Sequence, residues 1–390
     1  MTGLRPCWVE VDLDALRGNL EAIKRHLEPG VEVMAVVKAD GYGHGARQVA
    51  EVALEAGARF LAVAILDEAL ELRASGITAP ILVLGYIPPW QAEAVVRHQV
   101  TVTVYEEGMV RALDRAARRA GRRAPVHLKV DTGMGRLGVR GSAELRRLAA
   151  AIRACPGVVL EGVFTHFAAA DEPDKAYTLE QVDRFRSALD NLKREGLEPV
   201  YRHAANSAGI LDVPSSYFNL VRPGLILYGL YPSRHVRRLE GVRPALTWKA
   251  RLAHVKVVEA GAFISYGRTY RASRSELIGT VPVGYADGYS RLLSNRGRVL
   301  LRGRSFPVVG RVCMDQLMVR LEGLEPPPEP GEEVVLLGES GEARFTADDM
   351  AECVGTINYE VVCAIARRVP RLYLRKGVPV EVRTLLGTRR

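Results

Sequence analysis

Apolar strand-like runs alternate with helix-like stretches eight times between residues 31 and 229, which restricts the possible folds more than any other feature of the chain. The strand-like runs are VEVMAVVK, FLAVA, ILVLG, VTVTVY, VHLKVD, VVLEGVFTH, VYRHAA and NLVRPGLILYG. The stretches between them, such as 45–57, 142–154 and 179–196, carry apolar residues at three- and four-residue spacing, which is typical of amphipathic helices. Eight βα units within about 200 residues predict a (β/α)8 barrel of the TIM type rather than an open doubly wound sheet.

The pattern changes after Gly229, where short β-rich segments separated by turns replace the alternation. These segments are 245–258, 277–287, 298–312, 315–321 and 332–339, and only 345–355 and its surroundings predict a helix. We therefore expect a barrel domain over residues 1–240, followed by a mostly-β domain over residues 241–390. A strand followed by a helix is predicted at 8–20, and the strand, at about 7–12, is a candidate to join the β domain.

The composition is that of a globular protein, with 48% hydrophobic and 25% charged residues in 390. No apolar stretch reaches the roughly 18 residues of a membrane helix. The first residues, MTGLRPCWVEVD, contain no apolar signal core, so we expect a cytoplasmic protein without a membrane partner. The five cysteines form no CxxC pair and no zinc-ligand spacing, which predicts free thiols and no metal site.

The formal charge of +9 raises the question of nucleic-acid binding. Arginine supplies most of this charge, because lysine occurs only eight times. The basic residues are scattered among Asp and Glu along helix-like faces, as in RALDRAARRAGRR, rather than gathered in one patch. A solvated surface is the better interpretation, and we expect no nucleic-acid partner.

Polar side chains accumulate where the predicted barrel strands end. In a barrel of this type, residues just beyond the carboxyl ends of the strands face the active site. Each of these residues alone has an ordinary structural role, such as a helix cap for Asn206 or a surface ion pair for Arg136. Their shared position at one barrel face favours a functional site. They are Lys38, Tyr42, Lys129, Asp131, Arg136, His166, Asn206, Ser207, Arg222, Gly224 and Leu225.

The stretch VVKADGYGHG, residues 36–45, predicts the chemistry of this site. An apolar run ends there in a single lysine, Lys38, which either reaches to solvent or pairs or reacts with another group. A lysine at a barrel mouth is well suited to hold a carbonyl cofactor as a Schiff base. The loops after strands seven and eight are the usual phosphate site of such barrels, where Ser207 offers a hydroxyl and Gly224 and Leu225 offer backbone N–H groups. Together they predict pyridoxal 5′-phosphate.

With these motifs the chain resembles the alanine racemases, which are pyridoxal-phosphate enzymes of fold type III. The resemblance covers essentially the whole chain, without departure at a motif position. It is carried by VVKADGYGHG, VDTGMGRLGVR, THFAAADE, HAANSAG, VRPGLILYG, ISYGRTY, VGYADGY, GRVCMDQ and TINYE. It implies interconversion of L-alanine and D-alanine, supplying D-alanine for peptidoglycan, by a head-to-tail homodimer with shared active sites.

The resemblance also implies roles for individual residues. Lys38 would hold the cofactor and act as one catalytic base, and Tyr266 of the partner subunit would be the base on the opposite face. Arg222 would hydrogen-bond the pyridine nitrogen, with support from His166. Further cofactor contacts would come from Tyr42, Arg136, Asn206, Ser207, Gly224, Leu225 and Tyr359, and substrate contacts from Arg136 and Met314. Lys129, Asp171, Tyr285, Arg311 and Asp315 would line the approach to the site. In some relatives the equivalent of Lys129 is carbamylated and bonds the arginine that corresponds to Arg136.

Two other cofactor-dependent functions remain as alternatives. A pyridoxal-phosphate amino-acid decarboxylase of the same architecture would want an acidic residue at the pyridine nitrogen and a reactive cysteine in the β domain, whereas this chain has Arg222 and the Tyr266 motif. A non-catalytic cofactor carrier of the single-barrel kind would lack the β domain. Within the racemases, Tyr359 and the motif at Met314 narrow the pocket and favour alanine over larger substrates.

Overall fold

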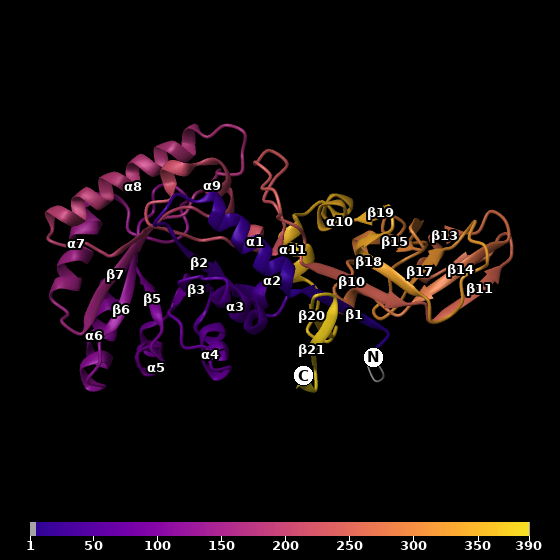
Figure 1. Cartoon of the computed structure of the whole chain (residues 1–390), viewed down its shortest axis with the longest axis horizontal. Helices are drawn as coiled ribbons and strands as arrows, with labels where there is room; N and C mark the ends of the chain where they lie inside the picture. The colour runs from indigo at the N-terminus through magenta and orange to yellow at the C-terminus, as the bar shows by residue number, and fades with distance from the viewer. Residues whose placement is uncertain (1–4, 390) are drawn as a thin grey trace. The chain divides into compact units, whose positions relative to one another are not determined.

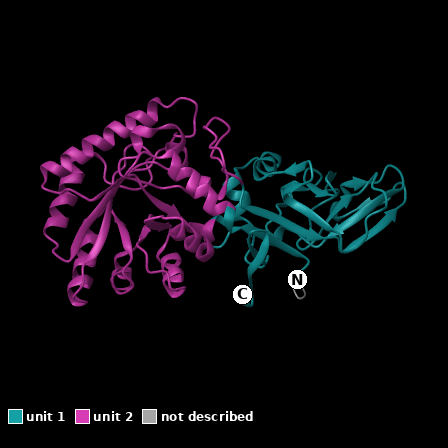
Figure 2. Ribbon diagram, in the orientation of Figure 1, with its two compact units in different colours: residues 1–14, 42–45, 244–390 teal, residues 15–41, 46–243 magenta. Residues whose placement is uncertain are grey.

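The computed structural model describes residues 5–389, which divide into two compact units (Figures 1 and 2). The barrel unit takes residues 15–41 and 46–243. The β unit takes the described residues within 1–14, 42–45 and 244–390. The short segment 42–45, which directly follows the Lys38 loop, is therefore counted with the β unit and not with its neighbours in the chain.

The barrel unit contains eight parallel strands in the order β8-β7-β6-β5-β4-β3-β2-β9. Their bounds are β2 Glu32–Val36, β3 Phe60–Val63, β4 Ile81–Val83, β5 Thr101–Val104, β6 Ala124–Lys129, β7 Val158–Phe164, β8 Tyr201–His203 and β9 Leu220–Val221. The middle strands β3, β4 and β5 are buried along their whole length, as expected of parallel strands covered by helices. A hydrogen bond from Arg222 N to Ala205 O joins the segments that follow β9 and β8, so the barrel is nearly closed. The predicted barrel is confirmed.

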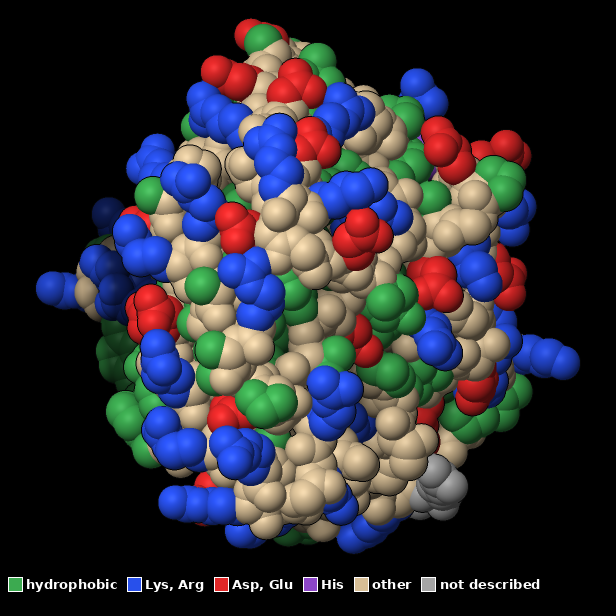
Figure 3. All heavy atoms as spheres, turned by 90° about the vertical axis from the view of Figure 1, so that its left-hand side faces the viewer, with side chains coloured by type: hydrophobic (Ala, Val, Ile, Leu, Met, Phe, Trp, Pro, Cys, Tyr) green, Lys and Arg blue, Asp and Glu red, His purple; other side chains and the backbone are tan. Residues whose placement is uncertain are grey.

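Helices surround these strands in the order that the sequence pattern predicts (Figure 1). They are α1 Leu13–His26, α3 Ala46–Glu55, α4 Leu66–Ala74, α5 Ala92–Arg97, α6 Glu107–Arg119, α7 Gly141–Arg153, α8 Ala176–Arg194 and α9 Ser207–Asp212. Their inner faces bury aliphatic and aromatic side chains, such as Phe185 of α8 and Leu113 of α6, against the strands. In the view of Figure 3, Lys and Arg side chains are interspersed with Asp and Glu over the surface.

The prediction of a last barrel strand over NLVRPGLILYG is largely wrong. Only Leu220–Val221 pairs with β2, and Leu225–Tyr228 forms a short 3-10 helix, η3. Pro223 has no N–H to donate to a neighbouring strand, so its position ends the pairing. The backbone N–H groups that follow Pro223 turn instead toward the end of β8, and this turn creates part of the site described below.

The β unit is built around a nine-stranded sheet in the order β16-β15-β18-β10-β1-β20-β21-β22, with β19 paired to β18. Its first strand in the chain, β1 (Cys7–Asp12), pairs antiparallel with β10 (Leu246–Arg251) and parallel with β20 (Arg371–Arg375). The other strands are β15 Arg298–Leu301, β16 Arg304–Pro307, β18 Glu333–Ser340, β19 Ala343–Phe345, β21 Val378–Thr384 and β22 Gly387–Arg389. Trp248 and Tyr373 are fully buried in its core.

A smaller three-stranded sheet, β11-β14-β17, completes the β unit together with the hairpin β12–β13. These strands are β11 His254–Val258, β12 Phe263–Ile264, β13 Tyr270–Arg271, β14 Glu276–Val281 and β17 Leu317–Arg320. Two helices lie between β19 and β20 in the chain, α10 (Ala347–Val354) and α11 (Asn358–Cys363), where the sequence predicts a single helical region. No helix within residues 5–389 is long and apolar enough to cross a membrane.

Candidate functional site

The barrel unit brings polar residues from different strands together at the carboxyl ends of its strands. Lys38 follows β2, Lys129 is the last residue of β6, and His166 lies just beyond β7. Ser207 follows β8, and Arg222 follows β9 directly. Because all eight strands are parallel, these ends meet at one face of the barrel, as predicted.

Four cationic side chains converge on one imidazole at this face. Burial lowers the pKa of His166 well below its usual value, and the charges of Lys129, Arg222, Arg136 and Lys38 lower it further. His166 is therefore neutral at neutral pH. An excess of positive charge over carboxylates is costly in a protein interior, and it favours binding of an anionic ligand.

Arg222 is the most buried of these cations, with 3% of its surface exposed. Its Nη1 donates to His203 Nδ1 at 2.8 Å, and its Nη2 donates to the carbonyl oxygens of Thr165 and Ala204 at 2.8 Å. Nη2 also lies 3.3 Å from His166 Nδ1. Burial and the charge of Arg136 lower the pKa of Arg222 to about 9, which leaves the guanidinium charged at neutral pH.

Two features of Arg222 indicate a binding role. Within the described part of the chain, no carboxylate pairs with this guanidinium, and its Nε makes no hydrogen bond. The contacts to His203, Thr165 and Ala204 fix the orientation of the side chain. The N–H of Nε on this rigid guanidinium thus remains for a group that is not part of the barrel.

Lys129 lies beside Arg222 in the same buried environment. It is 7% exposed, and its Nζ lies 4.2 Å from the centroid of the Phe164 ring. Burial, followed by the charges of Arg222 and Arg136, lowers its pKa well below the ordinary value for lysine. Among the charged groups around it, only Asp131 raises this pKa. The predicted loop residue Arg136 is exposed.

The loop after β6 is held by Asp131 and by a glycine. The carboxylate of Asp131 accepts hydrogen bonds from the backbone N–H groups of Gly133 and Gly135, both at 3.0 Å. Although burial raises the pKa of Asp131, these hydrogen bonds lower it overall. Gly138 has φ +123°, and a Cβ there would lie 2.6 Å from the backbone nitrogen of Asp131, so the loop can turn back only with glycine.

Ser207 organises the loops after β8 and β9. Its Oγ accepts hydrogen bonds from the backbone N–H groups of Gly224 at 3.1 Å and of Ile226 at 3.3 Å. Both lone pairs of the hydroxyl are then used, and its O–H remains for an acceptor outside the described residues. The side chain of Asn206 accepts from Gly209 N at 3.0 Å and caps α9, so here it has a structural contact.

A left-handed turn follows Lys38. Ala39, Asp40 and Gly41 have φ between 53° and 60°, Tyr42 has φ 51°, and Gly43 has φ 80°. Asp40 stabilises the turn, because its Oδ1 accepts from Ala46 N at 3.0 Å. Left-handed backbone costs non-glycine residues about 1–2 kcal/mol each. Strain of this kind is concentrated at functional sites, so the position of Lys38 is strongly determined.

In the β unit, three loops bring together the other predicted residues. Tyr266 lies in η4 (Tyr266–Arg268), and Ser265 before it donates from Oγ to Arg311 O at 2.6 Å. Tyr285 N donates to Cys313 O at 3.1 Å, next to Met314. Tyr266, Tyr285 and Met314 are 71%, 41% and 53% exposed, respectively. Large apolar and aromatic side chains so exposed on neighbouring loops are typical of an interaction surface.

The remaining predicted residues have simpler surroundings. Tyr42 and Tyr359 lie together in the β unit, with ring centroids 6.3 Å apart. Asp315 pairs with Arg368 at 2.6 Å. Asp171 is partly exposed in the barrel unit, where its carbonyl oxygen accepts from Ser233 Oγ.

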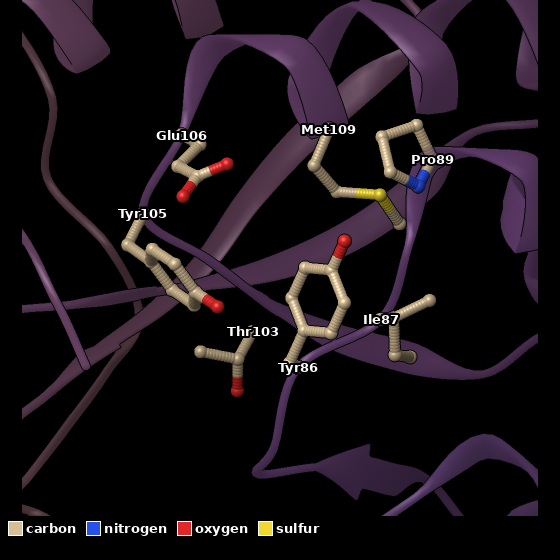
Figure 4. A pocket seen from close by; sticks show the side chains of 7 residues that line it. All are labelled: Tyr86, Ile87, Pro89, Thr103, Tyr105, Glu106 and Met109. Atoms are coloured by element: carbon tan, nitrogen blue, oxygen red, sulfur yellow. The ribbon is translucent and has the colours of Figure 1, made fainter. Parts of the chain in front are cut away.

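The sequence reasoning missed His203, which contacts Arg222 directly. This residue is the buried last residue of the short strand β8, and a histidine at the carboxyl end of a predicted barrel strand is a signal that could have identified it. A small pocket near the same barrel face contains none of the predicted residues. It is lined by Tyr86, Ile87, Pro89, Thr103, Tyr105, Glu106 and Met109, and Figure 4 shows these side chains.

Comparisons with known proteins give consistent matches over both units. Residues 11–232 match the family model described as alanine racemase, N-terminal domain, and residues 245–373 match alanine racemase, C-terminal domain. The alanine racemase of Symbiobacterium thermophilum is 52% identical over 373 residues, which cover 96% of this chain and 98% of the relative. The crystal structure of alanine racemase from Bacillus anthracis with bound L-Ala-P has a TM-score of 0.94 and 42% identity, covering 99% of both chains. That of alanine racemase from Bartonella henselae with covalently bound pyridoxal phosphate has a TM-score of 0.84 and 27% identity, covering 94% of this chain and 99% of that one.

Proposed function

The chain belongs to the alanine racemase family, and we propose on that basis that it interconverts L-alanine and D-alanine with bound pyridoxal 5′-phosphate. The observation that carries this proposal is the convergence of Lys38, Lys129, Arg136 and Arg222 on His166. This excess of positive charge suits a ligand with a phosphate group. The proposed biological role is supply of D-alanine for peptidoglycan in the cytoplasm, and it rests on family membership.

The donors at the barrel mouth fit this cofactor. The O–H of Ser207 is available for a phosphate oxygen, at the turn where cofactor phosphates bind in such barrels. The Nε of Arg222 is available for the pyridine nitrogen, and the partly buried Lys38 would attach the cofactor covalently. Tyr42, Asn206, Gly224, Leu225 and Tyr359 are proposed to complete the phosphate and ring contacts.

The chemistry then follows from two bases on opposite faces of the substrate. When bound, pyridoxal phosphate would spread the electron pair left on the α-carbon after proton removal. Lys38 would remove or return the proton on one face, and Tyr266 would do so on the other. Arg222 remains protonated and donates a hydrogen bond without giving up its proton, which limits the charge that reaches the ring. Limited ring charge disfavours side reactions such as transamination.

The same proposal includes a head-to-tail homodimer with shared active sites. Tyr266 is 71% exposed in the single chain, which is unusual for a catalytic base and suits a residue that works against a partner subunit. Met314 and Arg136 would contact the substrate carboxylate, and Lys129, Asp171, Tyr285, Arg311 and Asp315 would line the approach. The preference for alanine over serine should be modest, because one hydroxyl or methylene changes the binding free energy by only about 1–3 kcal/mol in such pockets.

An interconversion assay on a panel of amino acids, with and without added cofactor, tests the function. We expect racemisation of alanine that depends on the cofactor, and loss of both cofactor absorbance and activity in Lys38→Ala. Lys24→Ala is a matched control, because Lys24 lies on the surface, where its Nζ donates to the carbonyl oxygen of Ala56. Carbon dioxide release without racemisation would instead favour the decarboxylase alternative.

A further inference from the structure

A row of polar side chains runs through the barrel interior away from Arg222. Arg222 Nη1 lies 2.8 Å from His203 Nδ1, and His203 Nε2 lies 2.8 Å from His127 Nδ1. At the far end, His127 Nε2 lies 3.4 Å from Glu161 Oε2, close enough for electrostatic attraction but without the geometry of a hydrogen bond. His203 and His127 are fully buried, whereas Glu161 is partly exposed. The row therefore connects the buried guanidinium to a carboxylate that contacts solvent.

The donor direction of this row is fixed by Arg222, because a guanidinium can only donate. His203 Nδ1 must accept, so neutral His203 carries its proton on Nε2 and donates to His127 Nδ1. His127 must then carry its proton on Nε2, which faces Glu161. Both imidazoles are thus assigned the same tautomer, and every donor points from Arg222 toward Glu161.

The strands are shaped around this row. On β6 and β7, Val126 pairs with Leu160 and His127 pairs with Gly162, so Glu161 is the extra residue of a β-bulge. A Cβ on Gly162 would lie 2.6 Å from His127 Nδ1, so only glycine leaves room for the imidazole. The bulge and the glycine together bring His127 and Glu161 close to each other.

The surroundings keep the two imidazoles dry and neutral. The His203 ring stacks on Phe164 with centroids 4.8 Å apart, and the His127 ring has Phe60 at 6.0 Å and Tyr201 at 6.3 Å. Burial is the main cause that lowers the pKa of His127, and it lowers that of His203 well below the usual value. Neutral imidazoles can pass on the influence of a charge only through their hydrogen bonds.

Glu161 lies at the amino-terminal end of the barrel, opposite the candidate active site. Its Oε2 accepts from Thr101 Oγ1 at 3.3 Å. It lines a hollow of about 480 Å³ with Arg73, Arg97, His98 and other residues that lie before β4 and β5 or at the start of β5 and β6. Because the hollow is open to solvent, Glu161 avoids the cost of a fully buried carboxylate.

We propose that Glu161 is the remote counter-charge of Arg222, and that His127 and His203 transmit its effect as two hydrogen-bonded imidazoles. This inference rests on the proposed function and adds three positioning residues to it. A negative charge close to one end of such a row polarises the hydrogen bonds within it and strengthens them. Arg222 thereby keeps its charge and one orientation, with Nε directed to the ring nitrogen, although no carboxylate contacts it.

Nuclear magnetic resonance of the histidine side chains tests this proposal in the full-length protein purified with its cofactor. We expect His127 and His203 to be neutral at pH 7, protonated on Nε2, and to show two protected N–H protons shifted downfield. In Glu161→Gln, which removes the charge but keeps the shape, both N–H signals should move upfield. The kcat for racemisation should fall on the order of tenfold, as is typical when an outer hydrogen-bond partner is lost.

Glu32→Gln is the matched control. Glu32 begins β2 at the same end of the barrel, and Glu32 and Glu161 both raise the pKa of Arg59, after the larger effect of Tyr201. Because Glu32 is outside the row, its variant should keep the wild-type histidine signals and kcat.

Several outcomes would overturn the proposal. One is a proton on Nδ1 of either imidazole in the wild-type protein, a measurement that needs no variant to fold. Others are unchanged N–H signals in Glu161→Gln, or an equal shift in Glu32→Gln. Failure of the proposed function is distinguishable, since a protein that does not racemise alanine can still show the predicted tautomers and their response to Glu161→Gln.

Discussion

At the scale of single residues, the candidate site is defined by two buried cations, Arg222 and Lys129. Arg222 is almost fully buried, and carbonyl oxygens and an imidazole accept from its Nη1 and Nη2 groups, with no carboxylate among the described residues. Lys129 is held beside it over the Phe164 ring. Such an arrangement is unfavourable without a ligand, because buried charges need compensation. Binding of an anionic cofactor would supply it.

Tyr266 gives the sharpest prediction at this scale. Tyr266→Phe removes one base and leaves Lys38, so exchange of the α-proton of L-alanine in heavy water should slow by about 10²–10⁴-fold. Exchange of the α-proton of D-alanine should continue. Tyr86→Phe is the control, because Tyr86 is also exposed, at 54%, and lies outside the proposed site. Equal loss of exchange for both enantiomers would contradict the assignment of one base to each face.

At the scale of elements, tight turns position the functional loops, and Gly43 tests one of them. Gly43 has φ +80°, and a Cβ there would lie 2.2 Å from the carbonyl oxygen of Val362 in α11. Gly76 has a similar φ of +87° but no atom within 4 Å of its Cβ position. We expect Gly76→Ala to cost about 1–2 kcal/mol from backbone strain alone. Gly43→Ala should cost a further 1–3 kcal/mol or so from overpacking. Urea unfolding midpoints measure the difference, and equal midpoints would show that the close approach to α11 has no energetic effect.

Asp287 ties several segments of the β unit together and makes its stability depend on pH. Its fully buried carboxylate pairs with Arg5 and Arg368 and accepts from Gly284 N. Burial raises its pKa, but the hydrogen bonds from Arg5 and Arg368 lower it overall.

A lowered pKa in the folded state means that Asp287 stabilises the protein above the ordinary carboxyl pKa of 3.8, and that this stability is lost as the pH falls further. Asp287→Asn should therefore cost about 3 kcal/mol at pH 7. The difference from wild type should shrink below that pKa. Asp315→Asn is the control, because it also pairs with Arg368 but its side chain is 60% exposed. The free energies of unfolding of the wild type and both variants, measured across this range of pH, test the prediction. A difference between Asp287→Asn and the wild type that does not change with pH would refute the role of the charge.

At the scale of the whole molecule, the two units supply different parts of the proposed chemistry. The barrel unit holds Lys38 and the anion-binding groups, and the β unit carries Tyr266 on an exposed loop. Phe263 and Leu292 of the β unit are also 50% and 64% exposed. This much exposed apolar surface supports the proposed homodimer, in which the second base comes from the partner.

Mixed dimers test the shared site. Lys38→Ala and Tyr266→Phe subunits should each be nearly inactive alone. If every site takes its two bases from different chains, one site of each mixed dimer contains both bases, so statistically mixed samples should recover about a quarter of the wild-type activity. A fully active monomer, or mixed dimers without recovered activity, would exclude a shared site.

The amino-acid sequence by itself determined the barrel, the β-rich second part and the polar residues at the strand ends. These features depend on the periodicity of apolar residues over short segments, which can be read directly from consecutive residues of the sequence. The strand-end rule then located Lys38, His166, Ser207 and Arg222 at one face, because parallel strands end together.

Only the tertiary structure decided what these side chains contact. The 3-10 turn at Leu225–Tyr228 arises from a proline and from N–H groups that turn toward Ser207, seventeen residues from Gly224 in the chain. The contact of His127 with His203 joins residues 76 positions apart, and it requires both a bulge and a glycine on β7. Such contacts depend on the packing of distant segments, which no local pattern encodes.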